Sequence, residues 1–230
     1  MRFTPRSARS PPHPTRGAHS FLFCAGVGVD RSRVVHMTST EFVTDGEVVA
    51  HVSAFGVVVP IRSSEKLRHP VLAAWRDALT DDAPTTAEVL AIGPDVESAL
   101  HHLSPAVTTA AIDSRAGQLV MLHAAALADP ASGRTAVLVA ASGTGKTTAS
   151  VTLGKRFAYL TDETSAITPD GVVLPYRKPL SIIDGGHLKQ QIAPSDLGLL
   201  ATNRECRLAA LLVIERDKHH EGPPVVQALE

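Results

Sequence analysis

The residues with the clearest capacity for chemistry lie in one stretch, residues 135–150, which reads TAVLVAASGTGKTTAS. Lys146 follows a turn that contains Gly143 and Gly145, and Thr147 comes directly after the lysine. The backbone N–H groups of such a turn, the N-terminus of the helix that follows and the lysine ammonium together attract phosphates. The threonine hydroxyl is placed to bind Mg²⁺. The stretch therefore predicts a site for a nucleotide, with ATP and Mg²⁺ as cofactors.

The stretch matches the pattern G-x-x-x-x-G-K-[ST] except that Ala140 stands where the first glycine is usual. A strand–turn–helix connection without a ligand is the alternative. The predicted cofactor-binding residues are Ala141, Ser142, Gly143, Thr144, Gly145, Lys146, Thr147 and Thr148.

Two acids, Asp162 and Glu163, follow the apolar residues 158–161 and lie sixteen and seventeen positions past Lys146. At the end of a strand beside a phosphate loop, one acid can hold the metal or its water while the other accepts a proton. We predict Thr147 and Asp162 as metal ligands, with a solvated turn as the alternative. Arg177 and Lys178 then either reach phosphates or an anionic substrate, or belong to a solvated loop.

The elements that must position these residues can be read from hydrophobic patterns. Residues 135–140 and 119–127 predict two buried strands, joined by a hairpin turn at residues 129–134. His123 would then lie in a strand, either as a core residue or as a functional group. Further along the chain, residues 164–168 and 172–174 predict a hairpin, residues 187–199 a helix and residues 208–214 a buried strand.

The N-terminal region has a different pattern. Residues 47–61 predict two strands that meet at Gly56, and residues 88–92 predict a third. Pro70 can begin a helix that continues to Leu79. Residues 96–111 have helical spacing interrupted by Pro105, which predicts a kink or two helices with Ser104 capping the second. We expect a small α+β region.

Composition limits the class of protein. The 230 residues are 44% hydrophobic, and six of the 22 basic residues are arginines within residues 1–36, a segment rich in Pro, Ser and His. We expect this segment to be a disordered or non-native tail; a secretory signal is one alternative and translation from Met37 another. The rest of the chain is net acidic, which argues against a nucleic-acid partner. Without a long apolar run or paired cysteines, a cytoplasmic protein with no membrane partner is expected.

Three motifs in order carry a family resemblance: LHAAAL at residues 122–127, VLVAASGTGKTT at 137–148 and YLTDETSAI at 159–167. Together they resemble the catalytic domain of HPr kinase/phosphorylase and its relatives, over about residues 119–214. The resemblance implies an α/β, mixed-sheet P-loop fold of the HPr kinase/PEP-carboxykinase type. Residues 37–115 would then form the small N-terminal region, and residues 116–230 the kinase-like domain, shortened at its C-terminus.

The resemblance also implies catalytic roles for His123, Lys146, Asp162 and Glu163. The histidine would lie near the reacting phosphate, and the acid pair would supply the base. Here the second acid is Glu, and its interval from the lysine is one residue shorter than in the family, so either acid can be the base. The glycine-rich segment that follows in true HPr kinases is not recognisable, which argues against HPr as the acceptor.

We therefore expect a Mg-ATP-dependent kinase that phosphorylates a serine-type hydroxyl on a small protein, a peptide or a metabolite. A non-catalytic nucleotide-binding switch or partner-docking module is the alternative, and a fragment without function is a third. The identity of the acceptor is left open. The oligomeric state is also left open, and a homo-oligomer is one possibility.

Overall fold

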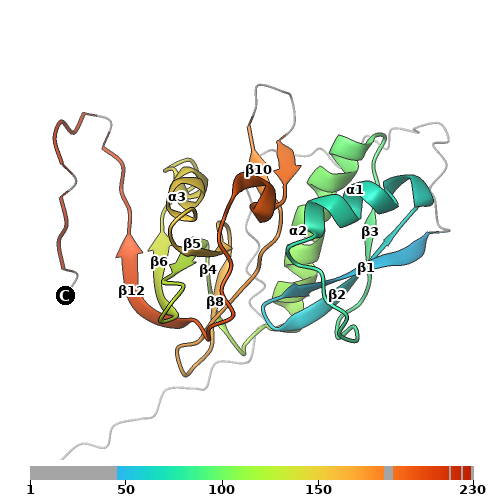
Figure 1. Cartoon of the computed structure of the whole chain (residues 1–230), viewed down its shortest axis with the longest axis horizontal. Helices are drawn as coiled ribbons and strands as arrows, with labels where there is room; N and C mark the ends of the chain where they lie inside the picture. Colours follow the sequence, from blue (N-terminus) through green and yellow to red (C-terminus); the bar gives the residue numbers. More distant parts are fainter. Residues whose placement is uncertain (1–45, 184–188, 218, 224, 229–230) are drawn as a thin grey trace, which may run out of the picture. The chain divides into compact units, whose positions relative to one another are not determined.

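The computed structural model describes residues 46–183, 189–217, 219–223 and 225–228. The tail expected at residues 1–36 lies outside the described residues. Residues 42–230 form one compact unit. In its described part this unit is mixed α/β, with three α-helices and four small sheets, two of which combine parallel and antiparallel pairs (Figure 1). The α/β class expected from the sequence is confirmed at this level.

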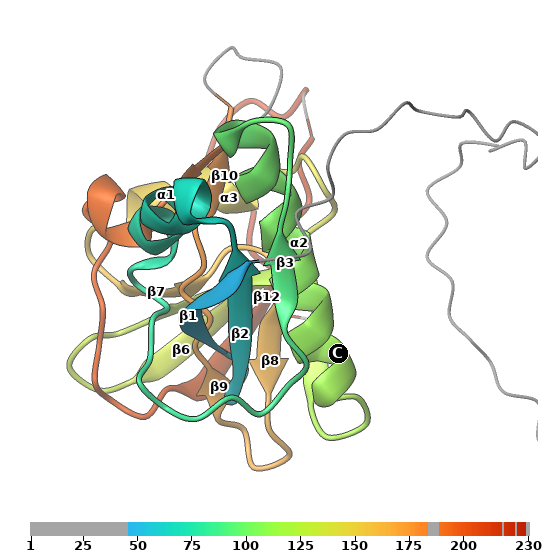
Figure 2. The same cartoon turned by 90° about the vertical axis from the view of Figure 1, so that its right-hand side faces the viewer.

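The first sheet has the order β1-β2-β3 and carries the predicted N-terminal hairpin. The strands β1 (Glu47–Ala54) and β2 (Val57–Ser63) are antiparallel and turn at Phe55-Gly56, where both residues have positive φ. The short strand β3 (Val89–Ala91) runs parallel to β2. Two helices, α1 (Glu65–Trp75) and α2 (Val96–Ser114), pack against this sheet (Figure 2).

The predicted start of the first helix at Pro70 is wrong, and so is the division of the second into two helices. Helix α1 begins at Glu65 and contains Pro70, because an earlier start allows Leu67 to pack on the core together with Val71. Helix α2 is one helix that runs through Pro105. Its apolar face, which includes the fully buried Leu103, is stabilised by packing, and this outweighs the backbone hydrogen bond that a proline removes.

The core of this region includes a residue from much later in the chain. The buried Tyr176 ring lies 4.7 Å from Phe55 and 6.5 Å from Trp75, measured between ring centroids. Its hydroxyl is 2.9 Å from the Thr108 hydroxyl of α2. The hydrophobic core that begins in residues 37–115 therefore extends into the segment that follows the expected site.

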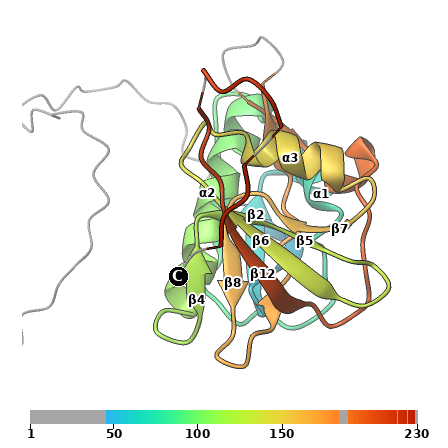
Figure 3. The same cartoon turned by 90° about the vertical axis from the view of Figure 1, so that its left-hand side faces the viewer.

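The second sheet carries the predicted site and has the order β12-β6-β5-β7 (Figure 3). Strand β5 is antiparallel to both β6 and β7, whereas β12 is parallel to β6. Helix α3 (Lys146–Leu153) contacts β5. This arrangement confirms the predicted hairpin and the strand–turn–helix. The strands are β5 (Ala124–Ala128), β6 (Arg134–Val139), β7 (Ala158–Thr161) and β12 (Arg207–Val213).

The single strand predicted at residues 119–127 is broken at His123. Its first half, β4 (Val120–Leu122), belongs to a separate antiparallel sheet with the predicted hairpin of β8 (Ser165–Ile167) and β9 (Val173–Leu174). The break arises because the Ala124 N–H donates to the Glu163 carbonyl, so the chain passes from one sheet to the other at this point.

Two C-terminal predictions are also corrected. Within the described part of residues 187–199, the chain forms β11 (Gln190–Ile192) and the 3₁₀ helix η1 (Pro194–Leu197) rather than a long helix; residues 187 and 188 lie outside the described residues. Gly198, with φ of 70°, ends the turn. Strand β11 pairs with β10 (Leu180–Ile182). Strand β12 exists as predicted, but the prediction that it is buried is wrong: all seven of its residues are exposed, because no other element in the described part of the chain covers its faces.

Among the described residues, no helix has both the length and the apolar character needed to cross a membrane.

Candidate functional site

The predicted phosphate loop has the backbone geometry that its glycines allow. Gly143 and Gly145 have φ of 79° and 112°, values that only glycine adopts readily, and α3 begins at the next residue, Lys146. A Cβ at either glycine would meet no neighbouring atom within 4 Å. The glycines are therefore required by backbone conformation rather than by close packing in this structure.

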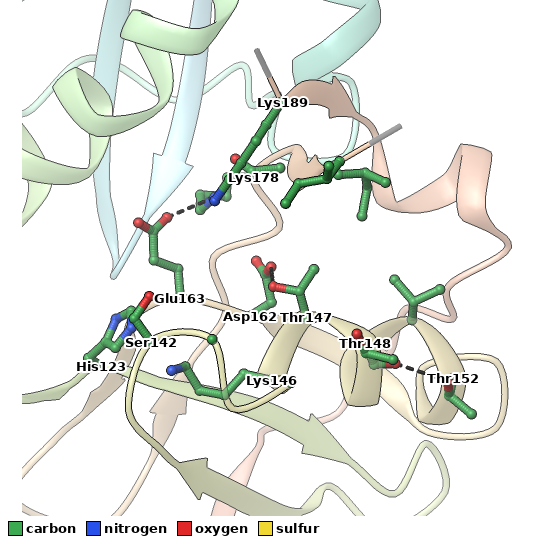
Figure 4. Close-up of a pocket in the computed structure, with 16 residues that line it drawn as sticks. His123, Ser142, Lys146, Thr147, Thr148, Thr152, Asp162, Glu163, Lys178 and Lys189 are labelled. Atoms are coloured by element: carbon green, nitrogen blue, oxygen red, sulfur yellow. Dashed lines mark hydrogen bonds and ion pairs between the residues drawn. The ribbon is translucent and has the colours of Figure 1, made fainter. Parts of the chain in front are cut away.

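A cavity of about 600 Å³ lies over the loop and brings most of the predicted site residues together (Figure 4). Ala141 and Thr144 are the predicted residues that do not line it; they line a neighbouring cavity. The predicted residues that line it are His123, Ser142, Gly143, Gly145, Lys146, Thr147, Thr148, Asp162 and Glu163.

Asp162 is held by two hydroxyl groups. The Thr147 hydroxyl donates to Asp162 Oδ2 and the Tyr159 hydroxyl donates to Oδ1, each at 2.9 Å. Burial and the Asp162 charge raise the pKa of Tyr159 well above its ordinary value, so Tyr159 is a stable neutral donor. The acid therefore faces the first turn of α3. Sequence reasoning missed Tyr159, because no motif marks a tyrosine three residues before an acid.

Glu163 has a different environment. Its carboxylate forms a 2.9 Å ion pair with Lys178 Nζ, and the Lys178 side chain is only 2% exposed. Burial raises the pKa of Glu163, but the charge and hydrogen bond of Lys178, with smaller effects of His123 and Lys189, bring the pKa below its ordinary value. Glu163 is therefore ionised at neutral pH.

The adjacent cations Arg177 and Lys178 have separate tasks. Arg177 donates to the carbonyl groups of Tyr159 and Leu200 at 2.7 and 2.8 Å, and lies 3.5 Å from Asp77. It joins β7 to other elements and does not line the cavity. Lys178 does line the cavity. Neither residue is a solvated cation, so the alternative of a solvated loop is wrong for both.

Lys146 is folded back onto its own loop. Its ammonium donates to the carbonyl groups of Ala140 and Ala141 at 2.7 and 3.2 Å. Burial lowers the pKa of Lys146, and the charges of Asp162 and Glu163 oppose this effect. The ammonium therefore lies at the loop, where it adds positive potential to that of the backbone N–H groups.

His123 is exposed and lies at the break between β4 and β5, not within a strand. It lines the cavity, and Figure 4 shows it beside Ser142, with the Glu163 side chain above. The reading of His123 as a core residue is therefore wrong. The remaining lining residues, which sequence reasoning did not single out as part of the site, come from α3, from β10 and the residue after it, and from the residue before β11: Val151, Thr152, Ser181, Ile182, Ile183 and Lys189.

Comparisons of the chain with models of protein families, with curated proteins and with solved structures found no match. Function must therefore be inferred from the site.

Proposed function

We propose that the chain binds Mg-ATP at residues 141–148 and transfers a phosphoryl group to a hydroxyl, as a kinase with the P-loop fold of the HPr kinase/PEP-carboxykinase type. The observation that carries this proposal is the 2.9 Å contact between the Thr147 hydroxyl and the Asp162 carboxylate. It joins the hydroxyl that follows the loop lysine to the acid at the end of β7. Thr147 and Asp162, fifteen positions apart and from two motifs, thus meet where a metal-bound phosphate is expected.

The donor set fits Mg²⁺, which prefers oxygen ligands and uses few protein side chains in phosphate sites. Thr147 and Asp162 would hold the ion, which supplies charge neutralisation on the phosphates when bound. Lys146 would exchange its two loop carbonyl acceptors for phosphate oxygens. The N–H groups of the loop and of the first turn of α3 would bind the same phosphates.

Glu163 is the better candidate for the base. Both oxygens of Asp162 accept hydrogen bonds from hydroxyl groups, whereas the Glu163 side chain is 42% exposed and faces the cavity. Glu163 would accept the proton of the acceptor hydroxyl. At the same time the hydroxyl oxygen would form a bond to the terminal phosphorus of ATP, and the bond between that phosphorus and ADP would break. The acceptor would be a small protein, a peptide or a metabolite, and His123 would lie beside the transferred group.

One observation favours the second candidate function, a nucleotide-binding switch or partner-docking module without catalysis. The ion pair of Glu163 with Lys178 lowers the pKa of the carboxylate, and a carboxylate of lower pKa is a weaker base.

The decisive experiment measures ATP binding with and without Mg²⁺, and then transfer of the labelled terminal phosphate of ATP to acceptors in a cell lysate. Lys146→Met should reduce transfer by about 10²- to 10³-fold, the typical loss of a preorganised electrostatic group. Lys155→Met is the matched control, because Lys155 is exposed and does not line the cavity. Binding without transfer to any acceptor would reject the kinase and support the switch, and absence of nucleotide binding would reject both.

A further inference from the structure

A second cavity, of about 490 Å³, borders the phosphate loop next to the first. It is lined by residues 139–144 and by residues 213–216, which follow or end strand β12. Ser142 and Gly143 line both cavities, so the two spaces meet at the loop. Neither Asp162, Glu163 nor His123 lines the second cavity. The reacting groups therefore belong to the first cavity only.

Strand pairing explains why β12 contributes to this wall. Strands β6 and β12 are parallel, with Val139 opposite Val213, so their carboxyl ends lie at the same edge of the sheet. The Ile214 N–H donates to the Val139 carbonyl at 2.8 Å and fixes the segment after β12 beside the segment that enters the loop. In sheets with parallel strands, ligands commonly bind at this edge.

The lining combines an apolar wall with a few polar groups. Val139, Ala140, Val213 and Ile214 supply the apolar part, while Glu215 and Arg216 are exposed polar residues that complete the lining. Val213 is 53% exposed, although it is apolar. A flat ring that is apolar on its faces and polar at its edge, together with sugar hydroxyl groups, matches such a lining.

We propose that this second cavity is the subsite for the nucleoside of the nucleotide whose phosphates bind the loop. The inference rests on the proposed nucleotide binding and adds where the base and ribose lie. The base packs against the Val139 and Val213 side chains, and the Glu215 carboxylate accepts hydrogen bonds from ribose hydroxyl groups. Because Ser142 and Gly143 border both cavities, one ligand can occupy them together.

The test compares ATP with inorganic tripolyphosphate, at one Mg²⁺ concentration and with the full chain. Tripolyphosphate can occupy the loop but has no nucleoside, so the unsubstituted chain should bind ATP at least about tenfold more tightly. Val213→Trp fills the second cavity with a residue that suits a strand, and should weaken ATP binding about tenfold while changing tripolyphosphate binding less than about twofold. Leu211→Trp is the matched control, because Leu211 is 50% exposed on the same strand but does not line the cavity; it should change neither affinity.

Each failure has a distinct meaning. If neither ATP nor tripolyphosphate binds, the proposed function fails and the subsite fails with it. If both bind equally tightly to the unsubstituted chain, the loop binds phosphates but the nucleoside subsite is rejected. Equal effects of Val213→Trp and Leu211→Trp on ATP binding would also reject it. If Val213→Trp does not fold, the comparison of the two ligands on the unsubstituted chain still rejects the subsite when both bind equally tightly.

Discussion

The two edge strands of the sheet that carries the site differ sharply in burial. All four residues of β7 are buried, whereas all seven residues of β12 are exposed. Both strands consist mainly of apolar residues, and both end beside the predicted phosphate loop. Their difference therefore arises from what covers them rather than from their own residues.

The outer edge of β7 is closed by hydrogen bonds. The Tyr159 N–H donates to the Leu200 carbonyl, the Tyr176 N–H donates to the Leu160 carbonyl, and Arg177 donates to the Tyr159 carbonyl. On the outer side of β12, the bonds found among the described residues end at Leu208, whose N–H donates to Gly171. The strand that positions the acids is thus fixed on all sides, while the strand proposed to contact the nucleoside is held mainly along β6.

The largest expected contrast is in stability. Leu160→Ala removes a side chain that is 2% exposed and should lower the free energy of unfolding by about 2–5 kcal/mol. Leu211→Ala removes one that is 50% exposed and should change it by no more than about 0.5 kcal/mol. Urea denaturation followed by circular dichroism measures both. Similar losses for the two variants would mean that β12 is covered in solution, and the contrast between the edges would not hold.

A smaller effect is expected from the buried hydroxyl beneath Asp162. Tyr159→Phe removes a hydrogen bond to a charged group, which is worth about 1.5–3 kcal/mol, and should raise the Mg²⁺ concentration needed for half-maximal ATP binding. Tyr176→Phe is the control, because its hydroxyl contacts Thr108 in the other core. If Tyr159→Phe leaves the Mg²⁺ dependence unchanged, Tyr159 has only a structural role.

The smallest effect is a shift in pH dependence at the end of β7. With Lys178 in place, the pKa of Glu163 is lowered. The folding stability that the ionised carboxylate contributes is therefore fully present above the ordinary glutamate pKa. It is lost as the pH falls through the lowered pKa. Lys178→Met should raise the pKa of Glu163 above its ordinary value, since burial then acts without the ion pair. The acid limb of phosphoryl transfer should move to higher pH.

Lys189→Met provides the comparison, because Lys189 also lines the cavity but affects the pKa of Glu163 less. It should shift the limb in the same direction by a smaller amount. The carboxyl resonance of Glu163 in ¹³C NMR follows the same titration without requiring turnover. If the resonance shifts in Lys178→Met but the acid limb stays in place, Asp162 rather than Glu163 is the base.

The parts of the site that local sequence determines were predictable. The loop between β6 and α3 and the acids after β7 follow from glycine, strand and helix preferences within a few residues. The hairpin turn at Asp129 was equally predictable, because the Asp129 carboxylate accepts hydrogen bonds from the N–H groups of Ala131 and Ser132 within the turn itself.

Features that depend on distant contacts were not predictable. Nothing near Lys178 in the sequence indicates that its ammonium reaches Glu163, fifteen residues earlier. The apolar pattern of β12 predicts a strand but cannot specify whether another element covers it. The break in the predicted strand at His123 depends on a backbone hydrogen bond between Ala124 and Glu163, which belong to separate motifs.

The Tyr176 ring has a consequence for how the molecule tolerates change. It is anchored among Phe55, Trp75 and Thr108 of the N-terminal layer, and it stands two positions before Lys178. Packing of Tyr176 on this N-terminal region thus helps to hold Lys178 in the position where it pairs with Glu163. A shorter chain that lacks the N-terminal region would lose these contacts with Tyr176. Lys178 would then be held less firmly, and its ion pair with the Glu163 carboxylate would weaken.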